Sequence, residues 1–143
     1  MKRILLIFCS ILILCCFSAY AEQDDMPIMV IVNGEQVVFP DQQPVIIKDR
    51  TLVPMRGIFD ALNLPLRWLE DPQMIKTKTA QGDLTFRIGS RMVNKNSNQV
   101  IMLEVAPQII NNRTMVPVRF IAESTGATAE WIESTKTVEI STK

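Results

Sequence analysis

The sequence contains no histidine, and its only cysteines and its only tyrosine lie within the first 20 residues. The cysteines are Cys9, Cys15 and Cys16, and the tyrosine is Tyr20. Residues 22–143 therefore lack the imidazole and thiolate ligands that zinc and copper sites use. They also lack the histidine base that activates the nucleophile of most serine hydrolases, and they cannot form a disulfide. We expect no metal, no cofactor, and a domain stabilised by its hydrophobic core alone.

The N-terminus carries a short apolar segment. Two basic residues precede the apolar residues 4–17, and small residues follow at Ala19 and Ala21. This pattern predicts a signal peptide over residues 1–21, which is removed after Ala21. The segment is shorter than the roughly 20 residues of a membrane-spanning helix, so we expect no stable membrane insertion after cleavage. A retained anchor and a lipidated cysteine are the alternatives, but no small residue precedes the late cysteines. The protein is expected to be secreted or associated with the cell surface.

The charge of the remaining chain is close to neutral. Residues 22–27 are polar and acidic and are interpreted as a flexible lead-in, and residues 28–143 as one domain of ordinary length. Without the signal peptide, 13 basic residues stand against 15 acidic ones, a net charge of −2. Such a domain lacks the excess of positive charge with which proteins bind nucleic acid or an anionic membrane. Exported domains without cysteine are commoner in bacteria than in eukaryotes, which favours a bacterial source.

The chain also contains an internal repeat. The heptapeptide RTLVPMR spans Arg50–Arg56, and RTMVPVR spans Arg113–Arg119, an offset of 63 residues. A tryptophan recurs at the same offset, and further identities extend the match over residues 44–79 and 107–142. Two copies of so long a period are typical of one domain with two related halves, not of a solenoid array.

Each copy predicts the same order of elements. The β-branched residues 45–47 predict a strand, Lys48-Asp49 a tight turn, and residues 50–53 a returning strand. The counterpart of this turn in the second copy is Asn111-Asn112. Pro54 is expected to be the first residue of a helix, where proline sacrifices no hydrogen bond.

The remaining signals complete a fold class. Pro117 is expected to open the second helix, and each helix has an apolar stripe at helical spacing. Asn63 and Gly126 accept the left-handed conformation and are expected to end the two helices. Asn33-Gly34 between two apolar runs predicts a hairpin near the start of the domain. We predict an α+β fold in which antiparallel strands are wrapped around two short helices.

These motifs resemble a known family. A strand and turn, the pattern Arg-Thr-hydrophobic-Val-Pro-hydrophobic-Arg, a helix, and a strand with tryptophan and an acidic residue resemble the copper amine oxidase-like N-terminal domain, or stalk domain. The resemblance covers about residues 28–141. It implies an accessory module of exported Gram-positive bacterial proteins. It implies no amine oxidase activity, because the histidines and tyrosine of that chemistry belong to a separate catalytic domain. Asn-Gly is usual at the two tight turns in the family, and glycine is usual where Asn63 stands.

Six side chains are candidates for a binding site. They recur in register between the two copies: Arg50, Arg56, Arg113, Arg119, Trp68 and Trp131. Arginines in such a pattern could bind a carboxylate or another anion. Alternatively, Arg56 with Asp60 and Arg119 with Glu123 form pairs within each helix, and the other arginines cover apolar edges. The tryptophans could stack on sugars or anchor the core, and the core is the favoured interpretation.

Three functional hypotheses follow. The first is a non-catalytic, stalk-like module that binds at the cell envelope or acts as a spacer there. Its partner would be a cell-wall component or another exported protein. The second is a secreted protease inhibitor, with Lys48-Asp49 or the loop 94–98, which contains Lys95, as its bait. The third is an envelope hydrolase that uses the symmetric carboxylates Glu70 and Glu133.

Overall fold

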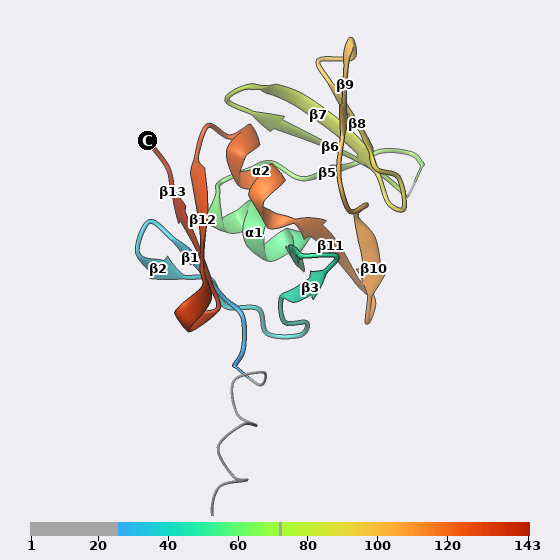
Figure 1. The fold of residues 1–143 in the computed structure, drawn as a ribbon. Helices are drawn as coiled ribbons and strands as arrows, with labels where there is room; N and C mark the ends of the chain where they lie inside the picture. Colours follow the sequence, from blue (N-terminus) through green and yellow to red (C-terminus); the bar gives the residue numbers. More distant parts are fainter. Residues whose placement is uncertain (1–25, 72) are drawn as a thin grey trace, which may run out of the picture.

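The computed structural model describes residues 26–71 and 73–143, which form an α+β fold (Figure 1). The described strands are β1 (Met29–Val32), β2 (Glu35–Gln36), β3 (Val45–Ile47), β4 (Arg50–Pro54), β5 (Arg67–Trp68), β6 (Met74–Thr79), β7 (Gly82–Arg87), β8 (Met92–Lys95), β9 (Gln99–Met102), β10 (Gln108–Ile110), β11 (Arg113–Pro117), β12 (Thr128–Ile132) and β13 (Thr137–Ser141). The helices are α1 (Met55–Ala61), α2 (Val118–Ser124) and the 3-10 helix η1 (Glu133–Thr135). The predicted signal peptide lies outside the described residues.

The described strands form three sheets. Sheet A has the order β12-β13-β1-β2, sheet B the order β10-β11-β4-β3, and sheet C the order β5-β6-β7-β8-β9. In Figure 1 the two α-helices lie between sheet A and sheet C. Sheet B joins the two heptapeptide strands at its centre, because β4 and β11 pair antiparallel with Val53 opposite Val116.

The elements of the two halves have matching bounds. β10, β11 and α2 each begin and end 63 residues after β3, β4 and α1, and β8 lies at the same distance from β1. The internal repeat itself stays an interpretation of this spacing. The strand β7 has no counterpart in the other half. It lies between β6 and β8 in sheet C, whereas β13 pairs directly with β1 in sheet A, with no strand between them.

The expectation of antiparallel strands is wrong for one strand pair. β1 and β13 form a parallel pair with Val30 opposite Val138. The two strands come from opposite ends of the described chain, so no hairpin dictates their direction. The other strand pairs of the described residues are antiparallel.

The tight turns agree with the sequence. Lys48 and Asp49 both have positive φ (49° and 59°), and so do Asn111 and Asn112 (48° and 61°). Positive φ at both central residues is the hairpin turn whose twist matches the flanking strands. Asn33-Gly34 forms the same kind of turn between β1 and β2.

The helix starts differ from the prediction. Pro54 and Pro117 are the last residues of β4 and β11 and stand just before each helix instead of inside it. Their extended ψ angles of 120° and 113° keep them in the sheet, where Pro54 pairs with Met115 and Pro117 with Leu52. The helix ends agree better, since Asn63 and Gly126 have the left-handed conformation just beyond them.

The main core lies against the helices. Met55, Ile58 and Phe59 of α1 are buried, as are their counterparts in α2, Val118, Ile121 and Ala122. They belong to one cluster with buried residues of sheets A and C, which explains why helices of seven residues are stable here. A smaller cluster contains Leu52, Val105 and Met115.

Candidate functional site

A surface cleft of about 460 Å³ brings together parts of both halves. It is lined by Val38, Phe39, Pro40, Asp41, Gln42, Pro54, Met55, Arg56, Gly57, Asp60, Leu66, Trp68, Asn112, Arg113 and Thr114. These residues come from the segment after β2, the first turns of α1, the approach to β5 and the β10–β11 hairpin. The cleft therefore combines an apolar surface with two arginines and two aspartates of balanced charge.

Trp68 is the aromatic side chain of this cleft that solvent reaches. It ends the two-residue strand β5 and is 40% exposed. The prediction of a core anchor is therefore wrong for Trp68, because β5 is too short and too far toward the sheet edge to bury it. Trp131, at the matching position, is partly buried against the core, and its indole nitrogen donates to the Glu133 carboxylate at 2.5 Å.

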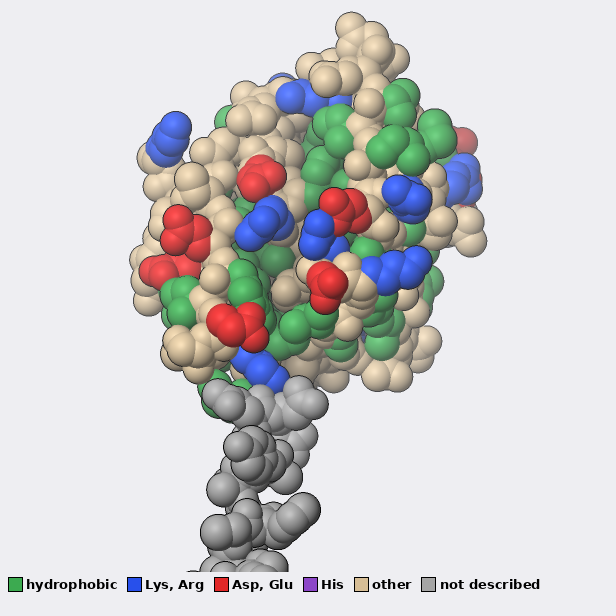
Figure 2. All heavy atoms as spheres, in the orientation of Figure 1, with side chains coloured by type: hydrophobic (Ala, Val, Ile, Leu, Met, Phe, Trp, Pro, Cys, Tyr) green, Lys and Arg blue, Asp and Glu red, His purple; other side chains and the backbone are tan. Residues whose placement is uncertain are grey.

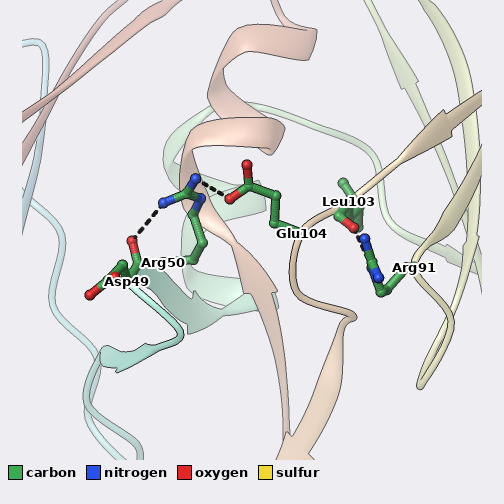
Figure 3. Close-up of polar contacts among 5 residues, drawn as sticks. All are labelled: Asp49, Arg50, Arg91, Leu103 and Glu104. Atoms are coloured by element: carbon green, nitrogen blue, oxygen red, sulfur yellow. Dashed lines mark hydrogen bonds and ion pairs between the residues drawn. The ribbon is translucent and has the colours of Figure 1, made fainter.

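Two of the candidate arginines form ion pairs that cross between the halves. Arg113 lies 2.5 Å from the Asp41 carboxylate, and Arg50 pairs with Glu104 (Figure 3). Asp41 and Glu104 are themselves 63 residues apart, as the arginines are. Each tight hairpin is thus held to the segment that precedes the hairpin of the other half. All four side chains are substantially exposed, so each pair contributes less than about 1 kcal/mol.

The other two arginines remain available to a ligand. The predicted pairs Arg56–Asp60 and Arg119–Glu123 are wrong, since none of these four side chains forms an ion pair with a described residue. Exposed pairs within a helix gain little, so the side chains have little reason to lock together. Arg56 and Asp60 line the cleft, whereas Arg119 does not.

The sequence did not predict the other wall of the cleft. Phe39, Pro40 and Asp41 belong to a segment without regular structure, but Phe39 is only 5% exposed. A methyl group on Gly57 would lie 2.7 Å from the Phe39 ring, so the ring needs a glycine beneath it. A glycine inside a predicted helix, near an apolar loop, was the signal that could have indicated this contact.

The remaining candidate residues lie on separate elements. Glu70 follows β5 of sheet C, and Glu133 begins η1, which follows β12 of sheet A. Lys48 lies in a tight turn, and Lys95 ends β8 between Leu84 and Gln99. Within residues 26–71 and 73–143, no cluster of three or more acidic, histidine or cysteine side chains could hold a metal ion.

The pKa of one described carboxyl group departs clearly from its ordinary value. Hydrogen bonds from the Gln73 backbone amide and from Arg87 lower the pKa of Asp71. Asp71 lies between β5 and β6 and does not line the cleft, so the shift in its pKa arises from its contacts with Gln73 and Arg87. In addition, no helix in the described part of the chain is both long and apolar enough to cross a membrane.

The chain matches a known protein family. A search of curated proteins found no similar sequence. The family model of the copper amine oxidase N-terminal domain matches residues 31–140. The match includes both heptapeptides, both helices and every residue that lines the cleft. The chain therefore belongs to the copper amine oxidase N-terminal domain family.

Proposed function

We propose that this protein is an exported, non-catalytic module that binds a component of the cell envelope through the cleft around Trp68. The observation that carries the proposal is the exposed indole of Trp68 beside Arg56 and Asp60, two charged groups without an ion-pair partner among the described residues. Membership of a family named for the N-terminal domain of copper amine oxidase, and not for its catalytic domain, supports a role without catalysis.

The chemistry of the cleft favours a saccharide of the cell wall. The face of an indole ring is a rigid apolar surface, and a sugar ring presents C–H groups that pack on such a surface. Arg56 supplies donors for hydroxyl or carboxylate oxygens, and Asp60 supplies acceptors for hydroxyl groups. Wall polymers that carry both hydroxyl and carboxylate groups match this combination. In this proposal the protein is secreted or attached to the cell surface, after removal of residues 1–21.

The two alternative functions receive no such support. A protease bait must be extended and accessible, but Lys48 and Asp49 form a tight turn with positive φ, and Lys95 is paired within sheet C. A paired-carboxylate hydrolase needs two carboxylates on one site, but Glu70 and Glu133 follow strands of different sheets. Another exported protein remains the alternative partner for the cleft.

Retention on isolated cell walls tests the proposal. Protein from expression of the full chain is incubated with protein-free walls, and the bound fraction is measured as a function of concentration. Trp68→Ala and Arg56→Ala are expected to weaken binding at least about tenfold, as is usual for central contacts of an interface. Arg119→Ala is the matched control, because Arg119 occupies the equivalent helix position away from the cleft.

Two outcomes of this experiment would contradict the proposal. Equal retention of wild type and Trp68→Ala would show that the cleft is not the binding surface. Retention on walls that still carry their proteins, without retention on the protein-free walls, would assign the cleft to an exported protein instead.

A further inference from the structure

One sheet edge lacks the features that keep edges from pairing with another chain. The edge strands of the three sheets are β12, β2, β10, β3, β5 and β9. Four of these strands have only two or three residues, and β12 carries the charge of Glu130. β9 has four residues, and the sequence is uncharged from residue 96 to 103. Short edges, charges and prolines normally prevent edge-to-edge association, and β9 has none of these protections.

The outer face of this edge is also apolar. Met92 lies directly opposite Met102 across the β8–β9 pair, and Val100 lies two residues along the same face. These side chains are 51%, 59% and 53% exposed, respectively. In Figure 1 the β8–β9 hairpin projects beyond the helices, and Figure 2 shows hydrophobic side chains gathered below its tip.

The backbone hydrogen bonds of β9 leave alternate groups free. The Leu103 amide donates to the Arg91 carbonyl, and the Arg91 guanidinium donates to the Leu103 carbonyl (Figure 3). Antiparallel pairs alternate between bonded and non-bonded, so the Met92–Met102 pair is non-bonded and the next pair along, at Ile101, is bonded. The N–H and C=O groups of Val100 and Met102 therefore point away from β8, and they bond no other described residue.

We propose that a second copy of this chain pairs with β9 through an antiparallel contact whose two-fold axis passes at Ile101. In this register Val100 of each copy lies opposite Met102 of the other, and each pair exchanges two backbone hydrogen bonds. The free groups of the edge satisfy one another, which is the self-complementarity that a two-fold interface requires. Met92, Val100 and Met102 of both copies then form one continuous apolar stripe.

The charges near the edge are compatible with this register. The closest acidic residue after β9 is Glu104, and the closest basic residue before it is Lys95. Antiparallel pairing about Ile101 places Glu104 beside residue 98 of the second copy, at the hairpin end that carries Lys95. Opposite charges therefore approach, and like charges lie at opposite ends of the interface. Because a single strand pair is small for a specific interface, the dimer is expected to dissociate on dilution.

Sedimentation velocity over a wide concentration range tests the proposal. Protein from expression of the full chain is expected to pass from monomer to dimer as its concentration rises. Val100→Pro removes an outward N–H without removing a β8–β9 hydrogen bond, and Met102→Lys places a charge on the stripe. Each change is expected to raise the dissociation constant at least tenfold, whereas Ile109→Lys, at an exposed apolar residue of edge strand β10, leaves it unchanged.

A crosslinking measurement gives an independent result if an edge variant folds poorly. In the proposed register the two Ile101 residues form a non-bonded antiparallel pair with Cα atoms about 4.5 Å apart, within the reach of a disulfide. In protein from which residues 1–21, with Cys9, Cys15 and Cys16, have been removed, Ile101→Cys is expected to form a disulfide-linked dimer on mild oxidation, whereas Ile109→Cys and wild type are not. A wild type that stays monomeric at every concentration would overturn the proposal. A dimer that Ile109→Lys weakens as much as Met102→Lys does, or a monomer that captures a different exported protein on this edge, would also overturn it.

Discussion

The contact between Gly57 and Phe39 shows how one residue shapes the cleft. Gly57 lies in α1, where alanine would favour the helix by about 1 kcal/mol. The Phe39 ring covers Gly57 so closely that a Cβ would lie 2.7 Å and 2.8 Å from two ring carbons. The ring is also 5% exposed, so its neighbours restrict the movement that would relieve the clash.

Gly57→Ala is therefore expected to destabilise the protein. Overpacking typically costs about 1–3 kcal/mol, so after the gain in helix propensity we expect a net loss of about 1 kcal/mol in the free energy of unfolding. Urea denaturation measures this difference. Combination with Phe39→Leu, which removes the ring, should make the same substitution less costly. A Gly57→Ala protein more stable than wild type would contradict the described contact.

Asp71 gives the protein a specific response to acid. Its pKa is lowered from 3.8, first by the hydrogen bond from the Gln73 amide and then by Arg87. A carboxyl group with a lowered pKa in the folded state stabilises that state above its unfolded pKa, and the contribution is lost as the pH falls through the folded value. Asp71→Ala is expected to lower the melting temperature at pH 7. The difference from wild type should shrink below pH 3.8, and an unchanged difference in acid would contradict this role.

At the scale of elements, the two tight hairpins carry different residues in the same conformation. Lys48 has φ 49°, and Asn111, at the matching position, has φ 48°. The left-handed conformation costs most L-residues about 1–2 kcal/mol, but asparagine adopts it more readily because its short side chain bonds locally. The first hairpin therefore contains a strain that the second avoids.

Reciprocal substitutions at these positions should have opposite effects. Lys48→Asn is expected to raise the free energy of unfolding by about 0.5–1 kcal/mol. Asn111→Lys is expected to lower it by at least as much, because Asn111 also donates to the Gln42 side chain at 2.7 Å. Thermal or urea unfolding of both variants provides the comparison. Two changes of the same sign would show that turn conformation does not decide the outcome.

Local elements could be predicted from the sequence because their signals are local. The turns at Lys48-Asp49 and Asn111-Asn112, the seven-residue helices and the residues beyond their ends all follow from side-chain type and spacing. The error at Pro54 arose because proline suits the end of a strand that pairs with Met115 as well as the start of a helix. Whether Pro54 ends the strand or begins the helix depends on its pairing with β11, which lies far along the chain.

At the scale of the whole molecule, the cleft depends on contacts that no local pattern encodes. Trp68 and Arg56 come from the first half, but the opposite wall includes Arg113, which Asp41 holds by an ion pair. The pairing of β1 with β13 joins opposite ends of the described chain in the same way. Sequence periodicity indicates which side chains are apolar, but not which distant segments meet, so it favours the core for Trp68 although this side chain is exposed.

The two tryptophans allow binding in the cleft to be measured directly. The chain has only Trp68 and Trp131, so Trp131→Phe makes Trp68 the sole fluorescent indole, and Trp68→Phe does the same for Trp131. Soluble cell-wall fragments are titrated into each variant, and the emission and its quenching by acrylamide are recorded. If the cleft binds these fragments, ligand shifts the emission of Trp68 and protects it from acrylamide, while Trp131 is unaffected. Saturable binding of the fragments with no change at Trp68, or with a change at Trp131 alone, would contradict it.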